Sequence, residues 1–592
     1  MPFEKAVVRS RPPGPRVLLA LALLAASACG APRGTPPPLT RLLPLLGAFT
    51  DLELAGETRP STLLALGEPR SCTVGVPRNG RLRFSVGLQG PLPAAGVQLR
   101  VAVDGSAVFE ESFATDAAGW KARTIDLPAP GPRRITFTAL AGAGPGGPTP
   151  GPAAAPEGRG LVAIGAPRVT SAGAPRGRVL LWISQDTLRA DHLGRFGYSR
   201  STSPAFDRLS NGFVVFSDAT ATAPWTLPSL ASQFTGRYPS LHGAVHKDYR
   251  RDPAATTVFQ ALAGAGFTVL GVTGNSYVSA AFGLADGFDG LWYIEGPAAG
   301  LNHGLRQVLR EWDGGDLAVF VHYMDPHYTY SPPAPYDRRF GADYRGRIDG
   351  ANFRDLKRGA DPRDVERVIS LYDGEIAYAD ESIDRLVARL SGQGLLDDAV
   401  IVYSSDHGDE LLDHGGWYHG HTLYRELLHV PLAIRVPHVP GTTVRHPISM
   451  VDLGPTLLEA LGVPIPASFQ GTSLLDLARG GSRRQELVFA ELQNNRDLPR
   501  RFQARKGNLA YTVTLPWPGS APPHAAPEEL YDLSADPGET QSLASSQVPA
   551  ELREPLLRYV QLADSLAGRR TRSHADREVL DRLKALGYLD AK

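Results

Sequence analysis

Residues 179–194 read V-L-L-W-I-S-Q-D-T-L-R-A-D-H-L-G, and residues 223–239 read A-P-W-T-L-P-S-L-A-S-Q-F-T-G-R-Y-P. The first stretch is an apolar run typical of a buried strand, and it leads to Asp186. The second places Thr226 in a turn before a helix. Open α/β sheets bind ligands at the carboxyl ends of their strands, and a helix start favours an oxyanion. We therefore expect a cation at Asp186 with Thr226 beside it; the alternative is a surface Asp and a capped helix.

The composition limits the classes of protein that fit. The 592 residues are enough for roughly two to four domains. Lys+Arg and Asp+Glu number 61 each, so no bulk charge favours a nucleic acid partner. The apolar content of 42% supports large cores.

The N-terminus predicts export. Basic residues precede the apolar run Val17–Ala26, which is too short to span a bilayer as a stable helix. The segment L-L-A-A-S-A-C-G resembles a bacterial lipoprotein signal, so we expect residues 1–29 to be a signal and Cys29 to carry lipid. The protein would then lie in the bacterial cell envelope, at the outer membrane or in the periplasm, with Cys29 as its only membrane contact. Secretion and a retained N-terminal anchor are the alternatives.

The first 180 residues are rich in Gly and Pro, and we expect them to hold two regions. Residues 30–69 predict a linker with a short helix. Residues 70–175 contain short runs with a period of two, such as R-L-R-F-S-V and V-Q-L-R-V-A-V, separated by Gly, Pro and Asp. This pattern predicts an antiparallel β-sandwich. Trp120 suits either its core or a sugar-binding surface.

From residue 176 the pattern changes to α/β. Apolar strands without alternation are separated by helices, which argues for a mostly parallel sheet between two helical layers. We expect a catalytic domain over 176–480 and a small α+β subdomain over 481–592. The predicted strands of the larger domain are Val179–Ile183, Thr268–Val272, Leu317–Val321, Val400–Tyr403 and Leu432–Arg435, and its predicted helices include Thr257–Ala265, Leu305–Trp312, Asp364–Leu390 and Leu453–Leu461.

A second predicted strand also ends at candidate metal ligands, as the strand before Asp186 does. I-V-Y-S-S leads to Asp406, His407 and Gly408. Carboxylate and imidazole are ligands for divalent cations, and the glycine permits a tight turn. Such residues also fill turns, but an Asp at another strand end strengthens the metal interpretation.

Two histidine-rich segments follow other strands. V-H-Y-M-D-P-H carries His322 and His327, and H-G-G-W-Y-H-G-H carries His419 and His421. A histidine beside a cation can protonate a leaving group, and we assign this role to His327 rather than His322. One of His419 and His421 would contact a substrate oxyanion. A structural role in turns is the alternative for each.

These pieces, in this order, resemble the sulfatase family of the alkaline phosphatase superfamily. The resembling motifs are D-T-L-R-A-D-H-L-G, T-L-P-S-L-A-S-Q-F-T-G-R-Y-P, D-P-H-Y-T-Y-S-P-P, S-S-D-H-G-D and E-L-Y-D-L-S-A-D-P-G-E-T. The resemblance implies an alkaline-phosphatase-like core. It implies one divalent metal ion (Ca, Mg or Mn) bound by Asp186, Asp406 and His407. It places Thr226 at the nucleophile position, with His327 and His419 or His421 contacting the transferred group.

The departures from the family pattern bear on the chemistry. Sulfatases use a formylglycine made from Cys or Ser, and Thr226 cannot be matured in that way, so no formylglycine is expected. Leu230 stands where the family has Arg, Thr187 replaces a second Asp, and Asn275 stands where a cation is usual. A threonine sulfate has no aldehyde to collapse to, whereas water can attack a phosphothreonine in line beside a cation.

The sequence thus predicts a metal-dependent ester hydrolase that acts through Thr226 on a sulfate or, by this chemistry, a phosphate ester. The ester could be carried by a glycan or a lipid headgroup. The alternatives are a phosphotransferase acting on an envelope lipid or glycan, and an inactive protein that only binds its ligand.

Overall fold

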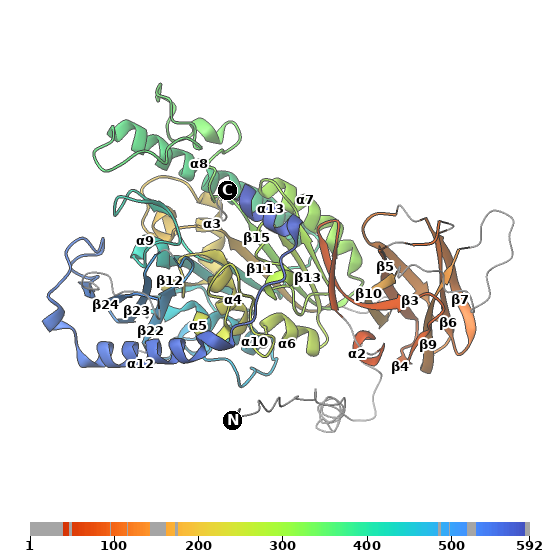
Figure 1. The fold of residues 1–592 in the computed structure, drawn as a ribbon. Coiled ribbons are helices and arrows are strands. Elements are labelled where there is room, and N and C mark those ends of the chain that lie inside the picture. Colours follow the sequence, from red (N-terminus) through yellow and green to blue (C-terminus); the bar gives the residue numbers. More distant parts are fainter. Residues whose placement is uncertain are drawn as a thin grey trace, which may run out of the picture. The chain divides into compact units, whose positions relative to one another are not determined.

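The computed structural model describes residues 39–46, 50–90, 92–94, 96–114, 117–142, 161–171, 176–482, 487–496, 498–517 and 528–586 (Figure 1). The expected signal segment and Cys29 lie outside these residues. No helix in the described ranges has both the length and the apolar character that a membrane crossing requires.

Parallel strands form the centre of the largest sheet. They run in the order β16 (Val400–Ser405), β11 (Arg176–Gln185), β15 (Gly315–Tyr323), β13 (Thr268–Thr273) and β14 (Gly290–Tyr293). Beyond β16, β19 (His429–Arg435) pairs antiparallel, and it is followed by β12 (Val214–Thr220), β20 (Thr442–Val444) and β21 (Ile448–Ser449). All five strands predicted for this domain are present.

Helices cover both faces of this sheet, which explains why its strands lack alternation. Leu180 and Trp182 of β11 pack in one core with α4, α6 and α10, whereas Leu181 and Ile183 pack in the other with α3, α7 and α8. Figure 1 shows α7 and α8 above the sheet and α4, α6 and α10 below it. The helices of this domain are α3 (Pro204–Leu209), α4 (Thr226–Thr235), α5 (Pro239–His242), α6 (Val258–Gly264), α7 (Ala298–Val308), α8 (Pro362–Gly392), α9 (Arg425–Leu428), α10 (Leu453–Ala460) and α11 (Leu475–Ala478).

The N-terminal module is a β-sandwich, as predicted. One sheet has the order β4-β9-β6-β7, and β3, β10, β5 and β8 face it across an apolar core. Its strands are β1 (Leu39–Arg41), β2 (Thr50–Leu54), β3 (Glu57–Ala65), β4 (Arg70–Val76), β5 (Gly80–Gln89), β6 (Val97–Val103), β7 (Ser106–Phe113), β8 (Lys121–Asp126), β9 (Gly131–Ala141) and β10 (Leu161–Ser171). Trp120 lies on this module, and its indole Nε1 donates to the Glu57 carbonyl at 3.0 Å.

The module begins earlier than the sequence predicts. A short helix, α2 (Leu43–Leu46), is present in the expected linker, but residues 50–54 and 57–65 form strands β2 and β3. Strand β3 is hard to recognise because several of its buried side chains, including Thr58 and Ser61, are polar. It pairs antiparallel with β14, so the sandwich and the α/β domain share one continuous sheet rather than lying on either side of a linker.

The C-terminal subdomain has its own antiparallel sheet. Strands β22 (Val488–Leu492), β23 (Arg500–Lys506), β24 (Leu509–Leu515) and β25 (Glu528–Asp532) pair in that order, and helices α12 (Ala550–Leu566) and α13 (Arg577–Ala585) follow. This arrangement agrees with the small α+β subdomain expected over residues 481–592.

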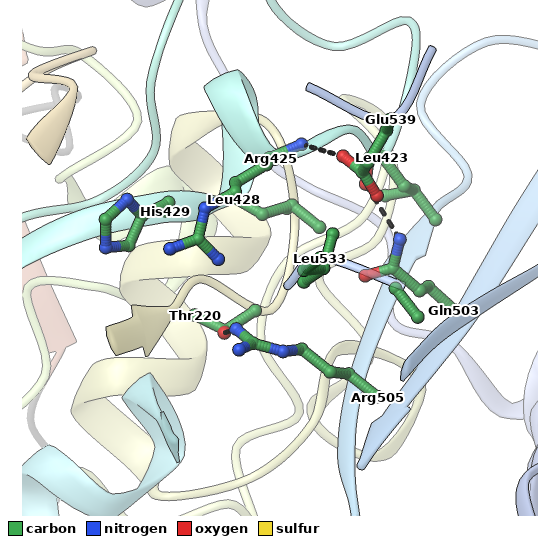
Figure 2. Close-up of a pocket in the computed structure, with 10 residues that line it drawn as sticks. Thr220, Leu423, Arg425, Leu428, His429, Gln503, Arg505, Leu533 and Glu539 are labelled. Atoms are coloured by element: carbon green, nitrogen blue, oxygen red, sulfur yellow. Dashed lines mark hydrogen bonds between the residues drawn. The ribbon is translucent and has the colours of Figure 1, made fainter. Parts of the chain in front are cut away.

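A small cavity marks where this subdomain meets the α/β domain (Figure 2). Glu539 accepts a hydrogen bond from the Arg425 backbone at 2.5 Å, and Gln503 donates to the Leu423 carbonyl at 2.9 Å. Burial raises the pKa of Glu539 to about 7. The cavity volume of about 20 Å³ is enough for a single water and too small for a substrate. Residues of both domains line the cavity, so it lies in the interface between them.

Arg59 holds the shared sheet together and allows a test of the fold. Its buried guanidinium pairs with Glu57 and with Glu311, the latter at 2.6 Å. Removing one partner of a buried pair leaves a charge uncompensated. We predict that Arg59→Leu lowers the free energy of unfolding by about 3 kcal/mol. Denaturant unfolding measures this change.

The matched control is Arg81→Leu, which breaks the exposed pair with Asp126. That change is expected to cost less than about 1 kcal/mol. Equal costs for the two variants would show that Arg59 is not a determinant of the joined sheet.

Candidate active site

The carboxyl ends of three neighbouring strands bring the predicted residues together. Asp186 follows β11, Asp406 and His407 follow β16, and His322 is the penultimate residue of β15. The β11 and β15 strands pair with Ser184 opposite His322, and β11 and β16 pair with Gln185 opposite Ser405. In-register parallel pairing therefore delivers these side chains to one point, as expected from the two strand-end motifs.

Thr226 is the first residue of α4, and its hydroxyl lies at this point. The Oγ1 atom is 3.4 Å from Asp186 Oδ2 and 3.3 Å from His407 Nε2. Asn275 Nδ2 donates to the same oxygen at 3.3 Å. All four side chains are fully buried, so the hydroxyl is held among polar groups in a site with little access to bulk water.

Two buried carboxylates meet here with oxygens that lack hydrogen bonds. Asp186 Oδ2 accepts from Asn275 Nδ2 at 2.7 Å, and Asp406 Oδ1 accepts from the Thr187 and His407 backbones at 3.2 and 2.9 Å. Asp186 Oδ1 and Asp406 Oδ2 are buried without a hydrogen-bond partner. Such oxygens are costly in the interior unless a cation binds them.

The pKa values of Asp186 and Asp406 also indicate a cation site. Burial favours a high pKa for Asp186, but His327, His322 and His407 outweigh it and hold the pKa below its usual range. Burial and the Asp186 charge raise the pKa of Asp406 well above its usual value. A divalent cation would relieve this repulsion and let both groups ionise.

His407 has the tautomer that a metal ligand needs. Its Nδ1 lies 2.9 Å from the Gly408 carbonyl, which can only accept, so Nδ1 carries the proton and Nε2 carries the lone pair. Burial lowers its pKa to about 3, so the ring is neutral. Nε2 lies 3.5 Å from Asp186 Oδ1 and 3.4 Å from Asp406 Oδ2.

His322 is more central than the sequence suggested. Its Nε2 is 3.2 Å from Asp186 Oδ2, and Ser184 Oγ lies 3.0 Å from its Nδ1. Ligand atoms of Asp186, His322 and Asp406 lie within 4.8 Å of one another. Because O and N donors converge with unpaired carboxylate oxygens, these residues fit a divalent cation. The sequence offered His322 as a candidate beside His327 but favoured His327, because only the pairing of β11 with β15 shows that His322 lies at Asp186.

His327 and His419 border the site, whereas His421 is tied to another group. The His419 ring lies 5.1 Å from that of His327 and 4.5 Å from that of His407. His421 Nε2 is 2.6 Å from Glu410 Oε2. Of the two histidines left open by the sequence, the structure therefore places His419 beside His327 and His407.

Further residues orient these two histidines. His327 Nδ1 donates to the Tyr328 carbonyl at 2.7 Å, so the neutral ring has its lone pair on Nε2. Asp409 accepts from His419 Nδ1 at 2.7 Å and from the Tyr330 hydroxyl. Burial lowers the pKa of His419 to about 4 and raises that of Asp409 to about 6. Asp409 and Tyr330 stand within the motifs S-S-D-H-G-D and D-P-H-Y-T-Y-S-P-P, but the sequence alone assigned them no role, because only the fold shows their hydrogen bonds.

The replaced family positions have structural consequences. Leu230 is a residue of α4 that packs in the apolar core, with no exposed surface. Thr187 has a φ of 55°, a rare value for a β-branched residue. Its N–H donates to Asp406, and its carbonyl accepts from the Tyr372 hydroxyl at 2.7 Å. The strained Thr187 peptide therefore links Asp406 to α8 where the family has a second carboxylate.

The fold and the site together define an α/β protein with a candidate cation-binding site beside a buried hydroxyl group. The family model described as Sulfatase matches residues 178–463, and the model described as N-sulphoglucosamine sulphohydrolase, C-terminal, matches residues 413–564. The chain belongs to the sulfatase family of the alkaline phosphatase superfamily.

Individual relatives share only part of their length with this chain. Arylsulfatase K of Xenopus laevis is 30% identical over 198 residues, which are 32% of this chain and 36% of that protein. Choline-sulfatase of Rhizobium meliloti (strain 1021) is 30% identical over 185 residues, 31% of this chain and 34% of that protein. The chain thus spans about a third of the length of these curated relatives.

The fold also has solved counterparts. The phosphonate monoester hydrolase of Agrobacterium radiobacter superposes with a TM-score of 0.53 at 19% identity, covering 67% of this chain and 96% of that chain. At this identity the likeness establishes the fold only.

Metal binding can be tested by removing single ligands. We predict that Asp406→Asn and His322→Gln each lose the bound divalent ion and the rise in Tm that added Ca²⁺, Mg²⁺ or Mn²⁺ produces in the parent protein, because binding to the folded state alone stabilises it. Metal content by elemental analysis and thermal shift measure both effects.

Asp409→Asn is the matched control, because Asp409 is bonded to His419 and Tyr330 instead. It should keep the metal. Retention of full metal content by Asp406→Asn would contradict the assigned site.

Proposed function

We propose that this protein is a metal-dependent ester hydrolase in which Thr226 is the nucleophile and the substrate is a phosphate ester. The observation that carries the proposal is the buried Thr226 hydroxyl, at 3.4 and 3.3 Å from Asp186 and His407, at the first residue of α4. A divalent cation held by Asp186, Asp406 and His407, with His322 as a further ligand, would lower the pKa of the hydroxyl and polarise the ester.

In the first step Thr226 Oγ1 forms a bond to phosphorus, and the bond from phosphorus to the leaving oxygen breaks. Asp186 Oδ2, at 3.4 Å, is the nearby acceptor for the hydroxyl proton. His327 supplies a proton to the leaving oxygen from Nε2. Burial lowers the pKa of His327, and a bound anionic ester raises it again, so the ring takes up this proton with the substrate.

In the second step water attacks phosphorus in line, the bond from Thr226 to phosphorus breaks, and Thr226 Oγ1 takes back the proton held by Asp186. His327 accepts the proton of the water. His419, whose Nδ1 donates to Asp409 at 2.7 Å, would stabilise the charge on the transferred group once the bound anion raises its pKa and its Nε2 takes up a proton. If an alcohol replaced water, the same chemistry would give the phosphotransferase that the sequence left open.

Threonine favours phosphate over sulfate for a chemical reason. A sulfated Thr226 has no aldehyde form to return to, whereas phosphothreonine can be hydrolysed by attack at phosphorus. Asn275 also contributes no positive charge to the transferred group, although it contacts both Thr226 and Asp186. Among phosphate esters, a centre with this charge suits a diester, which carries one negative charge, better than a monoester, which carries about two.

Substitution of the nucleophile tests the proposal. We predict that Thr226→Ala lowers kcat/KM for an aryl phosphate ester by at least about a thousandfold, because the covalent route is lost. Thr226→Ser should retain activity. The assay compares aryl phosphate monoester, phosphate diester and sulfate esters with one leaving group, across Ca²⁺, Mg²⁺ and Mn²⁺.

Thr235→Ala is the control, since it removes a buried hydroxyl at the other end of α4, where Thr235 donates to the Ala231 carbonyl at 2.7 Å. It should keep activity. Turnover of the sulfate ester by protein with an unmodified Thr226 would overturn the preference for phosphate, and metal binding without turnover of any ester would favour the inactive binding protein.

A further inference from the structure

Arg354 is an exposed arginine at the edge of the site with an unusual set of partners. Its Nε donates to the Tyr418 hydroxyl at 2.8 Å, and its guanidinium carbon lies 4.6 Å from the centre of the Tyr328 ring and 4.9 Å from that of Tyr418. Among the described residues it makes no ion pair with a carboxylate. Other arginines of the chain, such as Arg59 and Arg189, pair with acids.

The two tyrosines connect Arg354 to the reaction centre. Tyr328 directly follows His327, and Tyr418 directly precedes His419. The His327 and His419 rings are 5.1 Å apart, and the Tyr328 and Tyr418 rings are 4.7 Å apart. An ester whose leaving oxygen lies at His327 would therefore extend its leaving group toward these rings and Arg354.

The segment that carries Arg354 is fixed in place. Phe353 is fully buried and stacks on Tyr330 with ring centres 5.3 Å apart. The Tyr328 hydroxyl donates to the Ala351 carbonyl at 3.2 Å, and Trp417 Nε1 donates to the Leu356 carbonyl at 2.9 Å. Arg354 is thus held with its charge toward solvent before any ligand arrives, which reduces the entropy lost on binding.

The chain segment around Arg354 also carries a net positive charge. Residues 338–358 contain seven Lys and Arg and three Asp. An excess of positive charge at the mouth of a site steers anions toward it. Aromatic rings beneath a guanidinium leave its planar edge able to bind a carboxylate or phosphate with two hydrogen bonds.

We propose that Arg354, Tyr328 and Tyr418 form a subsite that binds an anionic group carried by the leaving alcohol of the substrate. This inference rests on the proposed function and names its substrate class: an ester whose alcohol bears a carboxylate, sulfate or phosphate of its own. An acidic sugar and a glycerol phosphate headgroup share this chemistry.

The test uses two aryl phosphate esters with the same nitrophenol leaving group, one bearing a carboxylate and the other the neutral carboxamide. The parent protein is expected to show a KM about tenfold lower for the carboxylate ester, as for one charge-assisted contact. Arg354→Gln should abolish this ratio by raising KM for the carboxylate ester alone, and Arg354→Lys should restore part of it.

Arg345→Gln is the matched control, since Arg345 is an exposed arginine of the same segment that contacts only backbone carbonyls. It should leave the ratio unchanged. An equal loss on both esters in Arg354→Gln would show a structural role, and an unchanged ratio would show no role; either result overturns the subsite.

Binding separates this inference from the proposed function. If the parent protein cleaves neither ester, the hydrolase proposal fails for these substrates. Calorimetry of the two free phenols then tests the subsite without turnover. The subsite predicts that the parent protein binds the carboxylate phenol more tightly than the carboxamide phenol and that Arg354→Gln does not. Competition by glucuronic acid and by glycerol 3-phosphate, in parent and Arg354→Gln proteins, distinguishes a glycan source from a lipid headgroup source.

Discussion

The meeting of two buried carboxylates at neighbouring strand ends is the constraint on which the site depends. Asp186 and Asp406 have no exposed surface, and each keeps an oxygen without a hydrogen bond. Two such charges repel each other in the interior, so the fold must hold them by other means until a cation binds. The central strands, buried on both faces, fix their positions.

The neighbouring polar groups contact the two carboxylates. Asn275, His322 and His407 place polar hydrogens or lone pairs on the two carboxylates, and the strained Thr187 peptide donates to Asp406. Thr226 lies within hydrogen-bonding reach of the same atoms because α4 begins there. The centre is built from neutral and acidic side chains, whereas the positive charge of Arg354 lies outside it. In the proposed mechanism the transferred group therefore lies among neutral and acidic side chains, and the leaving group lies beside a positive charge.

Much of this arrangement could be predicted from the sequence. The apolar runs before Asp186 and Asp406 identify buried parallel strands, and the order of the motifs identifies the family. What sequence could not supply depends on contacts between distant segments. Strand β3 carries buried polar residues such as Thr58 and Ser61 and pairs with β14 far along the chain. His322 and Asn275 become site residues only because neighbouring strands place them beside Asp186. His419 and His421 are equivalent in sequence, and only the structure tells them apart, because His421 pairs with Glu410 whereas His419 lies beside His407.

The central claim is that Thr226 becomes covalently bound to the transferred group. The most direct test is to quench the metal-loaded protein in acid during turnover of an aryl phosphate ester and to analyse its peptides by mass spectrometry. The account predicts one added phosphoryl group on the peptide that contains Thr226, formed in the burst of phenol release and absent in Thr226→Ala. A burst with the label on another residue, or steady turnover that persists in Thr226→Ala, would contradict it.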